Sequence, residues 1–316
     1  MSSSGGQRGL AQNGERAAAP FLKWAGGKGQ LLAQLEPLLP AAFGRYIEPF
    51  VGGGAMFFHL HDLGRLARGA VLCDLNAELM NCYRVVQDEA ALPELISALR
   101  KHARHASSAE YFYRVRAWDR KPDAFERRSP VERAARTIFL NKTCYNGLYR
   151  LNSKGQFNVP YGKWAKPPRL FDEAKLRACH RALQGVELRC EGFEACLDWA
   201  KEGDFVYLDP PYHPLSRTAS FTTYTGSEFR ERHQRRLAEV FRVLAERGAL
   251  LMLSNSATPL VRRLYTAFRM EAVQARRAIN CRGGGRAGVE EVVVVSYPPA
   301  GAGGFPVAAG ARHGCG

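Results

Sequence analysis

A short apolar run that ends in two consecutive prolines constrains this chain more than any other stretch. Residues 204–212 read Asp-Phe-Val-Tyr-Leu-Asp-Pro-Pro-Tyr. The β-branched and aromatic residues predict a buried strand, and the prolines end it because they have no N–H for the sheet. In open α/β sheets the carboxyl end of a strand faces the ligand crevice. Four residues are therefore expected there, and we call them the tetrad: Asp209, Pro210, Pro211 and Tyr212.

The tetrad suits an amino group attached to a planar heterocycle. Asp209 can accept one N–H hydrogen, and the Pro210 carbonyl can accept the other because Pro211 has no N–H to occupy it. The Tyr212 ring offers a face for stacking, which a base reaches only by leaving its duplex. The alternative is a proline-terminated strand with a polar edge. An acid before the prolines and an aromatic residue after them favour the amine.

The charge balance points to a polyanionic partner. The chain has 45 Lys and Arg against 30 Asp and Glu, a net charge of +15. Nucleic acid is the leading candidate, and a membrane surface is the weaker one. The eight cysteines include no C-x-x-C pair, and none follows a proline, so we expect no metal site and no cysteine nucleophile for cytosine C6. No signal peptide or membrane-spanning run is visible, so we expect a cytoplasmic protein with reduced thiols.

Two glycine-rich stretches near the N-terminus precede predicted helices. The first, residues 21–29, contains Trp24 and Lys28 but lacks the P-loop spacing, which argues against a nucleoside triphosphate. Trp24 could equally stack on a ligand or fill the core. The second reads Glu48-Pro-Phe-Val-Gly-Gly-Gly54 after a predicted strand. Its glycines allow close approach of a ligand, and Glu48 at the strand end could hold a positive group.

Asp74 ends a second predicted strand, residues 70–75, about 20 residues beyond this glycine turn. An acid at that distance is placed to bind two ribose hydroxyls. The alternative is the N-cap of the helix that follows. Taken with the glycine turn, ribose binding is the favoured interpretation.

Residues 100–185 interrupt the α/β pattern with helical periodicity and many basic residues, which predicts an inserted domain. Within it, residues 145–164 alternate about a Ser-Lys-Gly turn and predict a β-hairpin with aromatic and basic side chains. A two-stranded ribbon fits the major groove of DNA, where Arg150 and Lys163 are side-chain types that bind guanine. Composition alone slightly favours the alternative, a structural hairpin packed on the insert's helices. The α/β pattern then returns from residue 186.

The motifs together resemble those of the Dam-type (D12 class) DNA adenine-N6 methyltransferases. They occur in the family's order over residues 21–297: Phe-Leu-Lys-Trp-Ala-Gly-Gly-Lys at 21–28, Glu-Pro-Phe-Val-Gly-Gly-Gly at 48–54, Asp-Leu-Asn at 74–76, Tyr-Asn-Gly-Leu-Tyr-Arg-Leu-Asn at 145–152, Phe-Asn-Val-Pro-Tyr-Gly at 157–162 and the tetrad.

The resemblance implies a Rossmann-like methyltransferase sheet with a helical DNA-recognition insert. It also implies S-adenosylmethionine as methyl donor and the N6 amine of a flipped-out adenine in double-stranded DNA as acceptor, within the palindrome GATC. The residues expected to bind the donor are Trp24, Lys28, Glu48, Phe50, Gly52, Gly54, Asp74, Phe193 and Asp209. Those expected to contact DNA are Lys23, Tyr145, Asn146, Leu148, Arg150, Asn152, Pro160, Lys163 and Trp164. Lys163 and Trp164 replace the Arg and Tyr of familiar family members, and Lys cannot copy the fork of an Arg.

The expected organisation is a disordered tail (1–20), a first catalytic part (21–99), the insert (100–185), a second catalytic part (186–299) and a flexible tail (300–316). Residues 213–227 are expected to form a lid, and the Gly/Arg-rich residues 276–286 a hairpin tip. We expect a monomer without an obligate protein partner. The alternatives are transfer to N4 of cytosine, which the same tetrad would serve, and a DNA-binding relative without catalysis.

Overall fold

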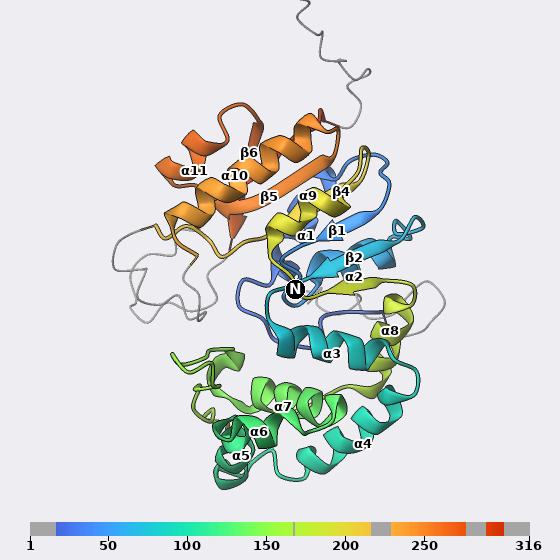
Figure 1. Ribbon diagram of the computed structural model, residues 1–316, viewed down its shortest axis with the longest axis vertical. Helices are drawn as coiled ribbons and strands as arrows, with labels where there is room; N and C mark the ends of the chain where they lie inside the picture. The colour runs from blue at the N-terminus through green and yellow to red at the C-terminus, as the bar shows by residue number, and fades with distance from the viewer. Residues whose placement is uncertain (1–16, 167, 216–228, 276–288, 300–316) are drawn as a thin grey trace, which may run out of the picture.

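A computed structural model of the chain describes residues 17–166, 168–215, 229–275 and 289–299 (Figure 1). In these residues the strands form one seven-stranded sheet with the order β3-β2-β1-β4-β5-β7-β6. The strands are β1 (Tyr46–Glu48), β2 (Ala70–Cys73), β3 (Glu187–Arg189), β4 (Phe205–Leu208), β5 (Leu250–Ser256), β6 (Arg269–Ala275) and β7 (Val289–Val295). Strands β3, β2, β1, β4 and β5 are parallel, whereas β7 runs antiparallel between β5 and β6.

The central strands are apolar on both sides because both faces of the sheet are covered. In β4, Phe205 and Tyr207 point into one hydrophobic cluster and Val206 and Leu208 into another. This explains why the sequence before the tetrad is a continuous apolar run rather than an alternating one.

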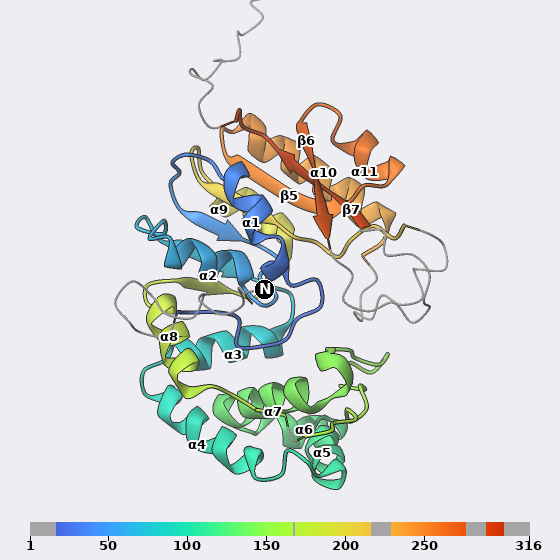
Figure 2. The same ribbon diagram turned by 180° about the vertical axis from the view of Figure 1, so that it is seen from behind.

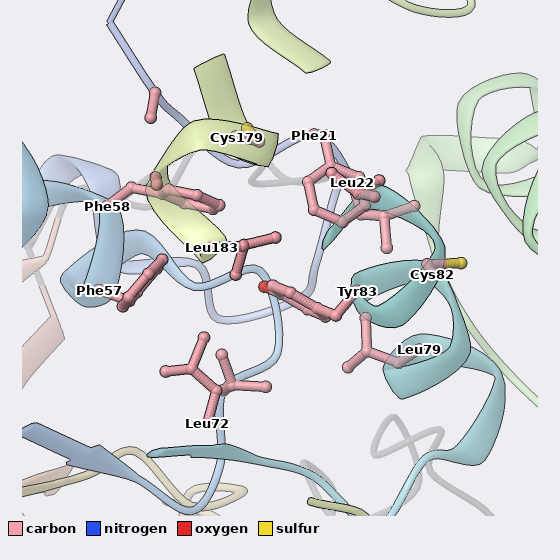
Figure 3. Packing of buried hydrophobic residues seen from close by; sticks show 14 of the residues in the cluster. Phe21, Leu22, Phe57, Phe58, Leu72, Leu79, Cys82, Tyr83, Cys179 and Leu183 are labelled. Atoms are coloured by element: carbon pink, nitrogen blue, oxygen red, sulfur yellow. The ribbon is translucent and has the colours of Figure 1, made fainter. Parts of the chain in front are cut away.

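Helices cover the two faces of the sheet (Figures 1 and 2). The first hydrophobic cluster draws on α1 (Leu32–Leu35), α2 (Ala55–Asp62), α3 (Ala77–Gln87) and α8 (Glu173–Leu183). The second draws on α9 (Cys196–Trp199), α10 (Glu231–Glu246) and α11 (Pro259–Leu264). Figure 3 shows the first cluster, where Phe21, Phe57, Tyr83 and Leu183 converge from four separate segments.

A second block of helices lies below α3 in Figure 1 and consists of α4 (Ala91–Ala103), α5 (Ala109–Arg116), α6 (Pro122–Glu126) and α7 (Pro130–Thr143). α7 packs along α3 and α4, so the first hydrophobic cluster runs without a break from the sheet into this block. Ser129 and Glu132 form a capping box that starts α7. α8 lies within the predicted insert boundaries but packs against α3 and α2, beside the sheet.

Residues 145–164 differ from the predicted regular β-hairpin. They begin with a short 3-10 helix, η4 (Tyr145–Gly147), and the described chain pairs here through two isolated bridges, Cys144 with Tyr161 and Leu151 with Phe157. The predicted Ser-Lys-Gly turn is present, closed by the amide of Asn152, which donates to the Gln156 carbonyl. In place of a regular ladder, Phe157 is buried in the first hydrophobic cluster and Leu148 packs against it.

Other predicted boundaries also differ from those in the structure. Order was predicted from Phe21, but the described chain begins at residue 17, with Ala18 buried and the Ala19 carbonyl accepting from Cys179 Sγ. The helix predicted after the first glycine-rich stretch is instead three short pieces, η1 (Lys28–Gln30), α1 and η2 (Glu36–Leu38), and Pro37 lies at the start of the last. Most of the predicted lid, the Gly/Arg-rich tip, residues 1–16 and the tail from 300 lie outside the described residues.

Candidate active site

The sheet reverses its direction of winding between β1 and β4, because the chain crosses from β3 at one edge to β4 on the other side of β1. Such a switch point leaves a crevice at the carboxyl ends of the strands. Glu48 ends β1, Asp74 follows β2 and Asp209 follows β4. Since these three strands are neighbours and parallel, their acids meet at one edge of the sheet.

These three carboxylates share an environment that penalises negative charge. Burial raises the pKa of Glu48 well above its usual value, with the nearby Asp209 adding to the rise. Burial also raises the pKa of Asp74, opposed by hydrogen bonds from the amides of Asn76 and Gly52. Burial raises the pKa of Asp209 to about 6, opposed by the Lys28 ammonium. Three crowded, desolvated acids favour a positively charged partner.

Lys28 brings a positive charge to the tetrad. Its Nζ lies 2.9 Å from Asp209 Oδ1, donates to the Gly26 carbonyl at 2.9 Å, and sits 4.4 Å from the centre of the Tyr212 ring. The side chain is almost fully buried although Lys is rarely so. The corner between Asp209 and Tyr212 therefore accommodates a nitrogen that donates hydrogen bonds above an aromatic face.

Three side chains that the sequence analysis did not select hold the tetrad from behind. Gln234 Nε2 donates to the Pro211 carbonyl at 2.9 Å, and the amide of His213 donates to Asn255 Oδ1 at 3.0 Å. The Tyr212 hydroxyl donates to Glu291 Oε2 at 2.6 Å. Asn255 carried a usable signal, a polar residue at the end of an apolar strand. Gln234 and Glu291 carried none, because their partners are 23 and 79 residues away.

The glycine turn after β1 is a backbone feature that other residues cannot reproduce. Gly52 has φ 47°, and a Cβ there would lie 2.6 Å from Cδ1 of Trp24. Gly52 also donates its amide to Asp74 Oδ2 at 3.1 Å and accepts from the Tyr83 hydroxyl at 3.1 Å. Gly54, with φ 70°, precedes α2 directly. The turn is therefore fastened to the end of β2 on one side and covered by an indole ring on the other.

The N-cap interpretation of Asp74 is wrong. Asn76 caps α3, since its side-chain oxygen accepts from the amide of Leu79 at 3.0 Å. Asp74 instead spans the gap to the glycine turn, with its Oδ1 accepting from the amide of Asn76 at 3.0 Å. Asp74 therefore ties the end of β2 to the glycine turn.

Aromatic rings gather beside this turn. Phe50 stacks on Phe193 with ring centres 5.5 Å apart, and Phe229 meets both at 5.9 Å. Phe229 lies just before α10, so three separate segments supply the cluster. Trp24 stacks on Tyr149 at 5.3 Å, which links the glycine turn to the 145–164 segment.

The residues predicted to contact DNA fall into one region, formed by the 145–164 segment and the N-terminal coil segment that carries Lys23. Asn141, fully buried, joins the two: it accepts from the Lys23 amide at 2.8 Å and donates to the Lys23 and Gly147 carbonyls. The Lys23 ammonium lies 5.3 Å from the Trp164 ring, and Trp164 Nε1 donates to the Thr143 carbonyl at 3.0 Å. Trp164 therefore has a structural role in addition to any contact with DNA.

The remaining predicted DNA contacts differ in exposure. Tyr145, Asn146, Pro160 and Lys163 are exposed, and Asn146 has the left-handed φ of 55°. The other three are partly buried: Leu148, Arg150 and Asn152. Arg150 Nε donates to Asn158 Oδ1 at 2.6 Å. Asn152 Oδ1 accepts from the backbone amides of Lys154 and Gln156.

Part of the basic run in the helical block is structural rather than a solvated face. Arg136, buried, pairs with Asp119 Oδ2 at 2.7 Å, and Arg120 pairs with Asp119 Oδ1 at 2.5 Å. Asp119 Oδ2 also accepts from the amide of Phe157 at 2.8 Å. Arg116 donates to the Val159 carbonyl at 3.1 Å. These side chains hold the 145–164 segment onto α5 and α7.

Over the described residues, no cluster of His, Cys, Asp and Glu has the arrangement of a metal site. In the same part of the chain, no helix has the length and apolar character needed to cross a membrane.

The fold and the site together define a class. The sheet is the Rossmann-like sheet of S-adenosylmethionine-dependent methyltransferases, because the antiparallel strand β7 lies second from its edge. The glycine turn and the acids lie at its switch point. The predicted fold class is thereby confirmed.

Comparison with known proteins narrows the class to a family. The family model of the D12 class of N6 adenine-specific DNA methyltransferases matches residues 24–279. The type II methyltransferase M.MjaIII of Methanocaldococcus jannaschii is 43% identical over 293 residues, covering 88% of this chain and 99% of that protein. The type II methyltransferase M1.LlaDCHI of Lactococcus lactis subsp. cremoris is 40% identical, covering 91% and 99%. The DNA adenine methylase of Escherichia coli (strain K12) is 36% identical, covering 88% and 95%.

The chain belongs to the D12 class of N6 adenine-specific DNA methyltransferases, and it is an enzyme that methylates adenine in DNA. The resemblance stated from the motifs is confirmed.

Proposed function

We propose that the chain transfers a methyl group from S-adenosylmethionine to N6 of an adenine that has left the stack of duplex DNA, within a short sequence that the resemblance implies is GATC. The single observation that carries this proposal is the pairing of Asp209 with a buried ammonium above the Tyr212 ring, next to a glycine turn at the switch point of the sheet. This arrangement supports the proposal because a carboxylate beside an aromatic face would suit an amine next to a positively charged donor.

The donor site is supported by charge and by space. S-adenosylmethionine supplies an electrophilic methyl group on a sulfonium and carries a second positive charge on its amino group. Glu48 and Asp209 would face these charges, and Asp74 would accept from the ribose hydroxyls. A Cβ at Gly52 would lie 2.6 Å from Cδ1 of Trp24, so glycine lets the indole pack directly on the turn, where it would form one wall of the donor site. The cluster of Phe50, Phe193 and Phe229 offers aromatic faces for the adenine ring of the donor.

The acceptor site is supported by the hydrogen-bond state of the tetrad. Within the described residues, the Pro211 carbonyl is occupied by Gln234, whereas the Pro210 carbonyl accepts no hydrogen bond. Asp209 and the Pro210 carbonyl are therefore the two acceptors available for an amine. As the amine nitrogen gains positive charge, both acceptors stabilise it more strongly than they did the neutral amine. Tyr212, fixed by Glu291, would stack on the base.

The test is to incubate the purified protein with the donor and with duplexes that contain GATC or a permuted sequence of the same composition. Digestion and mass spectrometry of the nucleosides should find N6-methyladenine, formed in the GATC duplex only. Formation of N4-methylcytosine would support cytosine as the acceptor. Formation of N6-methyladenine in the permuted duplex would contradict GATC as the recognition sequence but leave adenine as the acceptor.

The rate should depend on pH through Asp209. Its pKa is raised to about 6 by burial, with the charge of Glu291 adding to the rise and Lys28 opposing it. Because the ionised carboxylate is the acceptor, kcat/KM for the donor should fall as the pH drops through about 6. The acidic limb of the pH profile of kcat should lie at lower pH than that of kcat/KM, since a bound positively charged donor favours the ionised carboxylate. Glu291→Gln should also shift the limb of kcat/KM to lower pH, and an unchanged limb in that variant would contradict the assignment to Asp209.

A further inference from the structure

We infer that Gln234 and Asn255 act as a pair of positioning residues that fix the tetrad so that the Pro210 carbonyl, and not the Pro211 carbonyl, is presented to the target amine. The inference rests on the proposed role of the Pro210 carbonyl. Gln234 lies on α10 and Asn255 on β5, and both side chains are fully buried. We call them the amide pair.

The contacts of the amide pair fix the orientation of both side chains. Asn255 Oδ1 accepts from the amides of His213 at 3.0 Å and Ser256 at 2.9 Å, so its Nδ2 must face the other way. Nδ2 donates to Gln234 Oε1 at 3.0 Å. Gln234 therefore has its Nε2 directed at the Pro211 carbonyl, where the distance is 2.9 Å. Each donor in this relay meets an acceptor, so the arrangement has one self-consistent direction.

The tetrad needs such support because it cannot hold itself. Pro210 and Pro211 have no N–H groups, so two consecutive backbone donors are missing where the chain leaves β4. The amide pair replaces the missing ladder bonds with two side-chain hydrogen bonds beyond Pro210. Gln234 donates to the Pro211 carbonyl, and Asn255 accepts from the amide of His213. The Pro210 carbonyl is left without a partner in the described chain, immediately beside Asp209.

The amide pair also connects the tetrad to the aromatic cluster. Gln234 lies in the first turns of α10, and Phe229 immediately before this helix meets Phe50 and Phe193. Any shift of α10 relative to β5 would break the bond between Gln234 and Asn255 and move the Pro211 carbonyl with it. The acceptor for the amine and the aromatic wall proposed for the donor are thus tied to one rigid element.

The predicted outcome follows from geometry. Without the amide pair the tetrad should still bind both substrates, because Asp209, Tyr212 and the glycine turn remain. The Pro210 carbonyl should lose its alignment, and a displacement of about 1 Å in a reacting group costs up to roughly 100-fold in rate. The effect should therefore appear in the chemical step and not in binding.

The experiment compares Gln234→Leu, Asn255→Asp and the double variant in single-turnover methyl transfer at saturating donor and duplex. Each single variant should slow the step by about tenfold or more, while the dissociation constants for donor and duplex change by less than about threefold. The double variant should be close to the slower single variant, since both remove one relay. The matched control is Gln87→Leu, because Gln87 on α3 donates to the carbonyls of Leu183 and Val186, away from the tetrad. It should transfer methyl groups at the wild-type rate.

Two results would overturn the inference: a rate for Gln234→Leu equal to that of Gln87→Leu, or effects of the two single variants that multiply in the double variant. Hydrogen exchange of the His213 amide separates this failure from failure of the proposed function. Exchange should be faster in Asn255→Ala than in the wild type whatever base is methylated. Unchanged exchange would contradict the amide pair, whereas faster exchange in a protein whose wild type forms no N6-methyladenine would contradict the proposed function alone.

Discussion

Asp209→Asn should lower the single-turnover rate of methyl transfer by roughly 100- to 1000-fold, the range found when one preorganised group that stabilises developing charge is removed. The substitution keeps the size of the side chain but puts an amide where the carboxylate faces Lys28 at 2.9 Å. An amide oxygen carries no net charge to offset the positive charge that develops on the amine nitrogen. Duplex affinity should stay within about threefold of the wild type, because the DNA contacts predicted for Lys23 and residues 145–164 are unchanged.

The measurement is transfer of a tritiated methyl group with preformed protein–duplex complex, and the control is Asp198→Asn, an exposed acid on α9. Asp198→Asn should retain full activity. Turnover by Asp209→Asn at a rate near that of this control would refute the role of the carboxylate.

The same variant also tests the raised pKa of Asp209 through the pH dependence of stability. Since burial raises the folded pKa of Asp209 to about 6 from 3.8, the fold favours its protonated form. That contribution to the free energy of unfolding is present at low pH and is lost as the pH rises through about 6. Asn does not titrate, so the Tm of Asp209→Asn minus the Tm of the wild type should increase between about pH 4 and pH 7. A difference that falls with pH would contradict the raised pKa.

The parts of the site that the sequence predicted well are those whose cause is local. A strand that two prolines terminate must deliver its next side chains to the sheet edge, so residues 209–212 are found where the pattern put them. Gly52 and Gly54 likewise adopt positive φ because the turn requires it. Asp74, which follows β2, lies at the same edge of the sheet, since parallel strands bring their carboxyl ends together.

The parts that could not be predicted depend on contacts between distant segments. Gln234 belongs to an amphipathic basic helix in the sequence, and nothing within that helix indicates that one amide is buried against Pro211. Glu291 reaches Tyr212 only because β7 inserts between β5 and β6, an order that the periodicity of the last strands does not specify. Sequence reasoning therefore finds the groups that touch a substrate before it finds the groups that position them.

The basic residues of the helical block predicted an inserted domain, but composition did not indicate that several of them bind within the protein. Arg116, Arg120 and Arg136 donate to backbone carbonyls, and Arg120 and Arg136 also pair with Asp119. A charged residue contributes to net charge whether it faces DNA or the interior, so the total of +15 overstates the charge available for binding.

Asp119→Ala should strongly destabilise the helical block. It leaves the guanidinium of Arg136 buried without its carboxylate and removes the acceptor for the Phe157 amide. Removing one partner of a buried ion pair costs about 3–5 kcal/mol, so the free energy of unfolding measured in urea should fall by about that amount. Arg136→Met should cost less, because it leaves no buried positive charge behind.

The same substitution makes a prediction about DNA in which two effects have opposite signs. Removal of an acid makes the protein more basic, and by charge alone this strengthens binding to a duplex. Loss of the anchor for residues 145–164 weakens it, since this segment carries most of the predicted DNA contacts. We expect the anchor to dominate, with duplex affinity in Asp119→Ala lowered about tenfold in fluorescence anisotropy at a temperature where the variant is folded. Glu126→Ala, an exposed site in the same block, changes the charge equally and should bind the duplex as tightly as the wild type or slightly more tightly. Equal affinities in the two variants would mean that Asp119 supports the fold but not the recognition segment.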